Sequence, residues 1–586
     1  MKKILRYTIV LLSALTLWNC DAFLNLNPTD EVSSSLVYAS KDMAESAVIG
    51  VYNNLLYDYV SSDLGVLNWD AFAGVIDPYY ELYFSNYSFL NGNSQPNAGF
   101  FLTYWKRLYE GINRANDVIE NIGKVPDMSD ELKACRIAEC KFLRAYEYYR
   151  LNALWKGVPI YDKNLAPSEY TKPRSSEDAV WDFILGDLTD CINCASLPNK
   201  YASSSADYGR ITKGAAYALR GKVYMWKKQW DLAEADLLQV GTCGYSLLAD
   251  KPYADLFKLA NETCSEMVFS ARMVELSGYG NVFSNTYGSW QVAGGGGNNT
   301  YYMNQPFVDS YQCADGTEFD WDNFIPGYNA MDPKARSVYF LRDGMTEAEK
   351  TAMASYGADM SKYLPAGNEA RIKAIFEARD PRLLATVITP YSIYNGGYYG
   401  TATNYTRRWP FRNDTAPDND VKTKANSNYF YCIRKFVTVG LEGINKAYNP
   451  VDVPIIRYGQ VLIDLAECVN EQGRSAAALG YINDVRKRAG VAQYPVAGTP
   501  DKATVRDRII RERRWELACE EVLYYDELRQ GTWKDFRFSA GNGLREPWGS
   551  AVYTEHWGGD KFYRWAVPSS EIQKNNNLEQ NDGWVY

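Results

Sequence analysis

The sequence of 586 residues predicts a mostly α-helical fold, in which a tetratricopeptide-like scaffold of helical repeats carries a loop-rich half. The first observation is an internal repeat, in which a small residue is followed by apolar residues at offsets of 12, 16 and 19. The pattern occurs at Gly221, Ala233, Leu237 and Val240 and recurs at Ala466, Ala478, Ile482 and Val485, and its second half returns at Ala115, Ile119 and Ile122. Paired helices that cross closely need small residues at the crossing and larger residues to fill the gap beside it.

The second observation is the alternation of helical and non-helical stretches. Helical repeats are expected over about residues 41–58, 104–155, 176–240 and 455–530, with a first helix from Lys41 to Tyr57 and a long helix from Leu132 to Leu154. Three loop-rich segments, residues 68–100, 270–332 and 390–448, lack a helical period and are rich in Tyr, Asn and Gly. Long insertions of this kind in a repeat scaffold usually carry function rather than stability.

The segment from Arg511 to Gly531 is predicted to be one helix. Its apolar residues recur at spacings of three and four and form a single stripe, which consists of Trp515, Ala518, Val522, Tyr525 and Leu528. Charged residues lie off this stripe, and they favour a solvated face with an i,i+4 pair between Arg508 and Glu512. In a scaffold role, Glu512, Arg513 and Glu516 would instead hold neighbouring helices together.

The N-terminus has the features of a secretion signal followed by a lipid-attachment site. Lys2, Lys3 and Arg6 precede an apolar run from Ile9 to Leu17, which is too short to span a bilayer comfortably. Cys20 follows this run, so residues 1–19 are predicted to be a lipoprotein signal peptide and Cys20 the lipidated first residue of the mature protein. Residues 20–586 are expected to form a single domain that is attached to the membrane through lipid only.

The composition excludes some classes of partner. A net charge of −9 argues against binding to nucleic acid and against adhesion to an anionic membrane surface. Aromatic residues make up 15% of the chain, with 47 Tyr and 16 Trp. Such a content suits a protein that stacks rings on sugars, and it equally suits an aromatic-rich core.

Cysteine and histidine usage argues against a metal centre or a cofactor. Cys191 and Cys194 have metal-ligand spacing, but there is no second such pair and His556 is the only histidine, so no zinc site is expected. Several cysteines, such as Cys468 and Cys519, occur in helical patterns and are expected to be buried free thiols.

Candidate catalytic groups are weak. Glu520 and Glu521 adjoin in sequence, and adjacent helix residues point about 100° apart, which is a poor geometry for two carboxylates that flank one sugar bond. His556 has no accompanying nucleophile motif. A cluster of carboxylates at short spacing could hold Ca²⁺, but a solvated acidic turn is the favoured interpretation because the spacing is not that of a known calcium loop: Asp315, Glu318, Asp320 and Asp322.

Sugar binding needs flat aromatic faces against C–H surfaces together with polar groups for hydroxyls, and the loop-rich segments contain both. The candidates in the first segment are Trp69, Tyr79, Tyr80 and Tyr83, and those in the second are Tyr287, Trp290, Tyr301 and Trp321. Tyr398, Tyr399 and Trp409 in the third segment are reserve candidates.

A set of ordered motifs carries a resemblance to a known family. Besides the segment 511–531, these are Phe142–Leu151 with Gly157–Ile160, Glu377–Leu383, Ile456–Glu467, Ile482–Gly490 and Val567–Ile572 with Asn577–Trp584, where Asp582 replaces a usual Pro. Together they resemble the SusD/RagB family of outer-membrane, glycan-binding lipoproteins of Bacteroidetes. Asp77 resembles a recurrent aspartate of that family, and the family's ligand sites draw on the first two loop-rich segments.

The resemblance implies a SusD-like fold and binding without chemistry. The expected function is a lipid-anchored protein on the outer membrane, facing the cell exterior, that captures oligosaccharides or polysaccharides and delivers them to a SusC-like TonB-dependent transporter. Two alternatives remain open, namely a lipid-anchored all-α glycoside hydrolase and a repeat scaffold that binds a peptide or protein.

Overall fold

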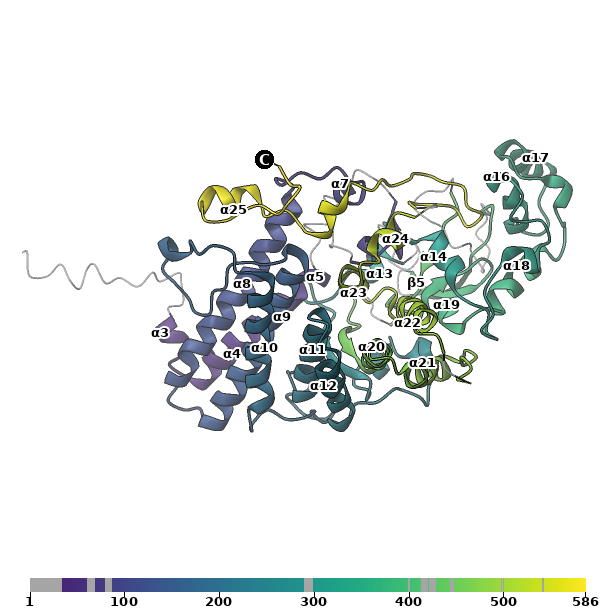
Figure 1. The fold of residues 1–586 in the computed structure, drawn as a ribbon. Coiled ribbons are helices and arrows are strands. Elements are labelled where there is room, and N and C mark those ends of the chain that lie inside the picture. Colours follow the sequence, from purple (N-terminus) through teal and green to yellow (C-terminus); the bar gives the residue numbers. More distant parts are fainter. Residues whose placement is uncertain are drawn as a thin grey trace, which may run out of the picture.

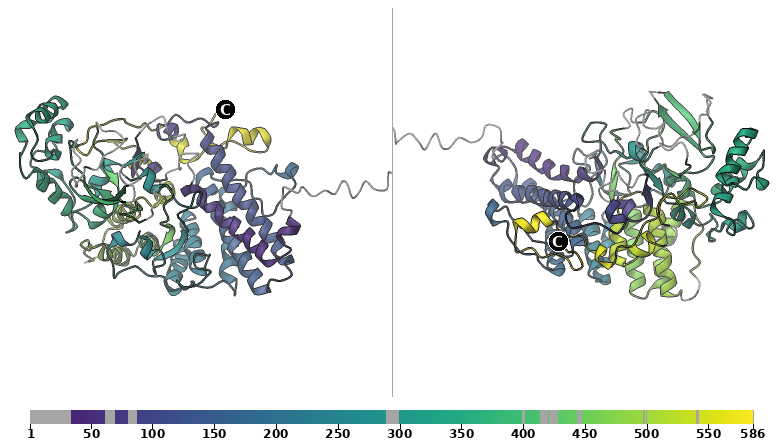
Figure 2. Two further views of the ribbon diagram at one scale, coloured as in Figure 1. Left: turned by 180° about the vertical axis from the view of Figure 1, so that it is seen from behind. Right: turned by 90° about the horizontal axis from the view of Figure 1, so that it is seen from above.

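The computed structural model describes residues 34–60, 69–79, 87–288, 299–398, 401–412, 420, 428–442, 447–496, 498, 500–539 and 542–585. The predicted signal peptide and Cys20 lie outside the described residues. The molecule is mostly helical and elongated, with the first helices at one end and α16–α18 at the other (Figures 1 and 2).

A continuous array of packed helices forms the scaffold (Figure 1). Its members are α4 (Lys41–Tyr52), α8 (Gly99–Asn121), α9 (Asp130–Trp155), α10 (Glu177–Asn193), α11 (Lys213–Trp226), α12 (Trp230–Thr242), α20 (Tyr458–Glu471), α21 (Ser475–Ala489) and α22 (Lys502–Leu517). Each of α8 to α12 packs on the next, and α12 packs on α20. The segment between α12 and α20 is therefore an insertion into one array, and the predicted repeat scaffold is confirmed.

The small residues of the repeat lie where paired helices cross. Gly221 on α11 faces α12 so closely that an added Cβ would lie 2.8 Å from Cγ of Leu237. In the second copy, Ala466 on α20 and Ala478 on α21 are both fully buried. The sequence offsets therefore report a packing requirement, because only a small side chain fits between these helices.

Helix starts follow local capping rules. Ser129, Ser176 and Thr212 precede α9, α10 and α11, and each hydroxyl accepts a hydrogen bond from the backbone N–H three residues on. The first helix is shorter than predicted, because α4 ends at Tyr52 and continues as a 3₁₀ turn, η1 (Asn53–Leu56), and then α5 (Tyr57–Val60).

The loop-rich half contains short elements. Its strands form two-stranded antiparallel sheets, namely β1 (Ile76–Pro78) with β3 (Tyr301–Met303), β2 (Met267–Ala271) with β8 (Val453–Arg457), β4 (Val387–Ile388) with β7 (Cys432–Ile433), and β5 (Ile393–Tyr398) with β6 (Thr401–Thr406). In the molecule as a whole, the remaining α-helices outside the scaffold array are α3 (Ser34–Val37), α6 (Trp69–Phe72), α7 (Tyr87–Leu90), α13 (Phe283–Thr286), α14 (Gln305–Ser310), α15 (Trp321–Phe324), α16 (Pro333–Arg336), α17 (Glu347–Tyr356), α18 (Asn368–Glu377), α19 (Pro381–Thr386), α23 (Leu523–Gln530), α24 (Trp533–Arg537) and α25 (Ser569–Lys574). Further 3₁₀ turns are η2 (Ile122–Lys124), η3 (Pro167–Glu169), η4 (Tyr253–Asp255), η5 (Leu259–Asn261), η6 (Ser337–Phe340), η7 (Met360–Lys362) and η8 (Asp560–Tyr563).

The prediction of one helix from Arg511 to Gly531 is wrong. The chain leaves the helix after Leu517 and resumes it at Leu523, with Cys519 and Glu521 at positive φ. The Asp70 carboxylate accepts hydrogen bonds from the backbone N–H groups of Cys519 (3.1 Å) and Glu521 (2.8 Å). A distant carboxylate thus satisfies backbone donors that a continuous helix would have used internally.

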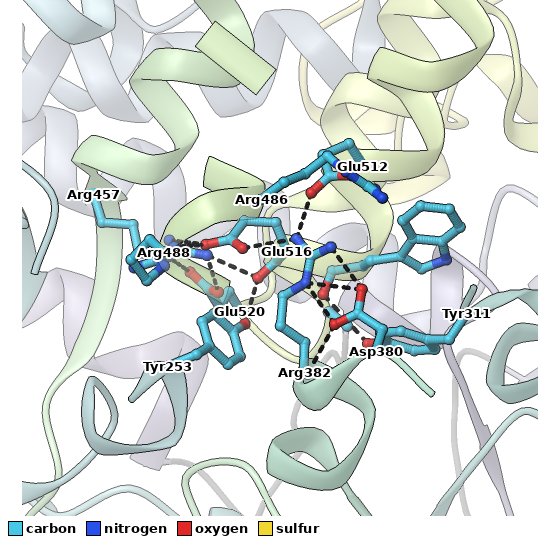
Figure 3. A network of polar contacts seen from close by, with 12 residues as sticks. Tyr253, Tyr311, Asp380, Arg382, Arg457, Arg486, Arg488, Glu512, Glu516 and Glu520 are labelled. Carbon is cyan, nitrogen blue, oxygen red and sulfur yellow. Dashed lines mark hydrogen bonds and ion pairs between the residues drawn. The ribbon is translucent and has the colours of Figure 1, made fainter. Parts of the chain in front are cut away.

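The charged face of this segment is buried, so the expected solvated face is also wrong (Figure 3). Glu516 lies 2.7 Å from Nη1 of Arg457 and 3.1 Å from Nη1 of Arg382, and it also pairs with Arg488. Burial acts to raise the pKa of Glu516, but these three guanidinium groups outweigh it and hold the pKa below its usual range. The segment therefore ties α22 to β8, α19 and α21.

Glu512 takes part in the same cluster. It pairs with Arg382 (2.6 Å) and Arg486 (2.9 Å), whereas Arg508 lies over the ring of Tyr494. The predicted Arg508–Glu512 pair is thus replaced by pairs to other elements. Nη2 of Arg513 reaches Glu467 on α20 at 2.9 Å, which agrees with a role of these charges in holding helices together.

The ten cysteines in the described part of the chain are free, and Cys468 and Cys519 are among the buried ones. The thiols of Cys191 and Cys194 donate to the backbone carbonyls of Ala138 (3.0 Å) and Ala134 (3.6 Å) on α9. Their spacing therefore follows the packing of α10 on α9.

Candidate ligand-binding site

The three loop-rich segments meet at one short ladder, which we call the β1–β3 junction (residues 76–79, 300–304 and 430–431). β1 from the first segment pairs with β3 from the second, so that Asp77 lies opposite Tyr302. An isolated bridge joins Met303 to Tyr431, which brings in the third segment. Residues that are far apart in sequence are thus assembled at one place, as a binding site requires.

Asp77 anchors this junction from inside. Its side chain is fully buried, and it accepts hydrogen bonds from Nδ2 of Asn304 and from Nη1 of Arg537, each at 2.9 Å. Arg537, on α24, also pairs with the buried carboxylate of Glu555. Asp77 therefore positions β1 and does not present a carboxylate to a ligand, which corrects its expected role as a ligand-binding residue.

Tyr79, which directly follows β1, is half-buried. Its N–H donates to the carbonyl of Thr300 at 2.7 Å, and its ring meets those of Tyr302 and Phe430 edge-on, each at a centroid distance of 6.0 Å. Among the predicted aromatic ligand residues whose side chains are described, Tyr79 alone is not buried. It is the described candidate best placed to offer part of a ring to a sugar.

The other described candidates are core residues, which corrects the expectation that they stack on sugar. Trp69 packs among Phe72, Tyr104, Tyr524, Tyr525 and Trp565. Tyr287 donates to Glu521 at 2.6 Å and meets the ring of Tyr301 edge-on. Trp321 stacks on Tyr328, and Trp409 packs between Tyr429 and Trp548. Large rings that are buried on all sides have no face left for a ligand.

The remaining candidates are not described. Tyr80, Tyr83, Trp290 and Tyr399 lie outside the described residues, and the side chain of Tyr398 on β5 is also outside them. In sequence, residues 80–86 continue directly from Tyr79, and residues 289–298 lead directly into Asn299 and Thr300. Two of the three expected ligand-binding stretches therefore begin or end at the β1–β3 junction.

Sequence reasoning missed the contribution of the C-terminal segment. The Tyr553 hydroxyl donates to the carbonyl of Pro78 at 2.6 Å, and Arg537 holds Asp77. A usable signal was present, because Trp548, Tyr553 and Trp557 cluster in a stretch without helical period, as the aromatic residues of the three predicted loops do.

The carboxylates that were considered for calcium or catalysis have other partners. Asp320 caps α15, Asp315 accepts from Thr317, and Glu318 pairs with Arg511. Glu520 and Glu521 are buried and bind different groups, namely Arg457 with Lys435 and Tyr287 with the N–H of Trp69. His556 is exposed. Among the described residues, no set of three metal-ligating side chains converges.

None of the described helices is both long and apolar enough to cross a membrane.

Comparisons with known proteins agree with this architecture. Residues 265–584 match the family model described as SusD family, and residues 73–225 match one described as starch-binding associating with outer membrane. A SusD-like protein (P25) of Formosa agariphila is 25% identical over 535 residues, which cover 88% of this chain and 87% of the relative.

Solved structures share the fold. A SusD-like protein from Bacteroides fragilis superposes with a TM-score of 0.71 at 22% identity, over 95% of this chain and 100% of that one. A surface glycan-binding protein A from Bacteroides thetaiotaomicron, solved in complex with laminarihexaose, gives a TM-score of 0.59 at 17% identity, over 92% of this chain and 99% of that one.

Proposed function

Because the chain belongs to the SusD family, we propose that it is a cell-surface glycan-binding lipoprotein that captures oligosaccharides or polysaccharides. The observation that carries the proposal is the β1–β3 junction, where three aromatic loop-rich segments converge on a rigid, internally anchored ladder. A preformed platform of this kind limits the entropy lost when a flexible glycan binds.

The ligand surface is proposed to comprise Tyr79 together with Tyr80, Tyr83 and Trp290, with Tyr398 and Tyr399 in reserve. Tyr79 supports this assignment because it is half-buried, held by two neighbouring rings and followed directly by Tyr80. Asp77 supports it indirectly, since its buried contacts fix the strand that ends beside Tyr79.

The cellular location is proposed from the description of a matching family model. The description of one matching family model, starch-binding associating with outer membrane, supports an outer-membrane address. We propose that residues 1–19 are removed, that Cys20 is lipidated, that residues 20–586 form a single domain facing the cell exterior, and that the captured glycan passes to a SusC-like TonB-dependent transporter. We propose capture without chemistry, which is supported by a solved structure of the same fold that is described as a surface glycan-binding protein.

Affinity electrophoresis against a panel of polysaccharides that includes starch and laminarin, followed by calorimetry with the retarding glycan, tests the proposal. We expect retardation by at least one polysaccharide, and weaker retardation of Tyr79→Ala. Tyr481→Ala is the matched control, because Tyr481 is a half-buried tyrosine on α21, away from the junction. Release of shorter sugars would favour the hydrolase alternative. Inert glycans together with co-purification of a peptide or a non-transporter protein would favour the scaffold alternative.

A further inference from the structure

A cavity with a volume of ≈310 Å³ lies where the N-terminal helices meet β2, away from the β1–β3 junction. Its walls come from α4 with η1, from the loop before α11, and from the end of β2 with the residues that follow it. The lining includes the side chains of Tyr52, Leu56, Tyr208, Ser270, Arg272 and Tyr279. None of these residues belongs to the β1–β3 junction, so this is a separate site. Its volume is at the small end of the range for ligand pockets, about 300–1,000 Å³.

The apolar part of the lining combines aliphatic side chains, such as Ile49 and Leu56, with tyrosine rings, and it is partly open to solvent. Tyr279 is 47% exposed. Tyr208 is half-buried, and the guanidinium of Arg272 lies 5.2 Å from its ring centroid. Arg272 thus lies over one face of Tyr208, while the exposed ring of Tyr279 can meet the C–H surface of a ligand.

The polar part of the lining includes a buried hydroxyl without a hydrogen-bond partner in the described part of the protein. Ser270 is 8% exposed and lines both this cavity and a neighbouring one of ≈20 Å³, and within the described part of the chain its hydroxyl has no protein hydrogen-bond partner. A buried hydroxyl without a partner costs free energy, which a ligand hydroxyl in the cavity would recover.

Arg272 supplies the second polar group. It pairs with Asp452, yet its side chain remains 44% exposed at the cavity. Gly209 makes this position possible, because a Cβ there would lie 3.0 Å from Cδ of Arg272, and its φ of +95° also favours glycine. The backbone is thus built to let this arginine lie along the cavity wall.

The charges of the lining are balanced, which indicates a neutral ligand. Arg272 is paired with Asp452, and Arg210 is paired with Glu45 (2.8 Å) and Glu139 (3.0 Å). An anion would need a cation that is not already neutralised. Aromatic faces, a free hydroxyl and an arginine with exposed N–H groups match a compact ligand with apolar faces and a rim of hydroxyls.

We propose that this cavity is a second carbohydrate site, which binds one neutral pyranose unit independently of the β1–β3 junction. The ring packs against Tyr279 and Tyr208, while Ser270 and Arg272 hydrogen-bond to its hydroxyls. A chain that binds glycan at two separated places gains avidity for long polymers, because the second contact is made at high effective concentration.

Saturation-transfer NMR on the full chain carrying Tyr79→Ala tests the site. The probes are the methyl β-pyranosides of glucose, galactose, mannose and xylose. We expect at least one of them to receive saturation, and titration to show a loss of affinity of roughly tenfold for Tyr279→Ala and a smaller loss for Ser270→Ala. Val274→Ala is the matched control, since Val274 is 54% exposed in the same loop but does not line the cavity; its affinity should stay unchanged.

Absence of transfer to all four pyranosides, or transfer that Tyr279→Ala and Ser270→Ala leave intact, overturns the second site. Unfolding temperatures of each variant separate a binding effect from a folding defect, and Tyr279, which is about half exposed, can be changed without opening the core. Retardation by polysaccharide that depends on Tyr79 but not on Tyr279 would overturn the second site and leave the proposed function standing. Retardation that depends on Tyr279 but not on Tyr79 would contradict ligand binding at the β1–β3 junction and would support the second site.

Discussion

Nη1 of Arg537 lies 2.9 Å from Oδ1 of Asp77, and both side chains are fully buried. This pair connects α24 near the C-terminus to β1 near the N-terminus, and it thereby fixes the strand that leads to Tyr79. Arg537 also binds the Glu555 carboxyl, so one buried guanidinium serves two carboxyl groups. Loss of Arg537 should therefore destabilise the fold more than loss of Asp77.

Arg537→Met should destabilise the protein more than Asp77→Asn. The arginine variant leaves the buried Asp77 carboxylate without the guanidinium that binds it and removes the hydrogen-bond donor of Glu555, which should cost about 3–5 kcal/mol. The asparagine variant keeps the Arg537–Glu555 pair and should cost about 1–3 kcal/mol, the loss expected for one buried hydrogen-bonded group. Urea unfolding of both variants measures the difference, and an Asp77→Asn cost equal to or above that of Arg537→Met would contradict it.

Glu555 should make stability depend on pH. Burial raises its pKa from 4.5 to about 8, against the opposite effect of Arg537. Between these values the folded protein holds a proton that the unfolded chain has released, so the free energy of unfolding falls as pH rises from about 5 to about 8. In Glu555→Gln this fall should be smaller, by at least about 1.4 kcal/mol.

Chemical unfolding at both pH values measures the effect of Glu555. Some fall should remain in the variant, because burial also raises the pKa of Glu527 to about 8. Glu579→Gln is the control, since Glu579 is exposed. The same pH dependence in wild type and Glu555→Gln would show that this carboxyl is ionised throughout the range.

Gly221→Ala should destabilise the helical array even though alanine favours helix. The added methyl would lie 2.8 Å from Cγ of Leu237, so the α11–α12 crossing must open. Overpacking of this kind costs about 1–3 kcal/mol, whereas the gain in helix propensity is about 1 kcal/mol. A double-mutant cycle with Leu237→Ala checks the cause, because Leu237→Ala should cost less in the Gly221→Ala background than in wild type. Additive effects would rule out the contact.

The scaffold was predictable because its signals are local. The spacing from Gly221 to Leu237 lies within one helix pair, and the packing of α11 on α12 follows from it. The ligand site was predictable only as a set of segments. β1 spans three residues and pairs with a strand more than 200 residues away, so no periodicity marks it. Trp69 was misassigned because a tryptophan in a short non-helical stretch suits a core as well as a sugar platform.

The break between α22 and α23 also lay beyond sequence reasoning. The stripe from Trp515 to Leu528 keeps helical spacing across the break. The carboxylate that accepts the freed N–H groups of Cys519 and Glu521 belongs to Asp70, about 450 residues earlier in the chain. Local patterns report what one segment prefers, and here a tertiary contact overrides that preference.

Glu516→Gln should be among the most damaging single substitutions in the scaffold. The change removes the charge that three buried guanidinium groups share, while Arg457 keeps Glu266 and Glu520, and Arg382 keeps Asp380 and Glu512. Loss of one member of a buried ionic cluster costs about 3–5 kcal/mol, and the remaining partners should hold the value near the lower end. Glu571→Gln, which breaks a surface pair with Lys574, should cost less than about 1 kcal/mol.

The acid limb of the stability curve gives an independent check on Glu516. Its lowered pKa means that the unfolded chain takes up a proton before the folded protein does, so this group stabilises the fold above its usual pKa of 4.5 and less as pH falls below that value. Glu516→Gln should therefore flatten the loss of stability between about pH 5 and pH 3, whereas Glu571→Gln should not. A wild-type-like acid limb in Glu516→Gln would mean that the guanidinium groups of Arg382, Arg457 and Arg488 are neutralised by their other partners, and that Glu516 is held in place by packing alone.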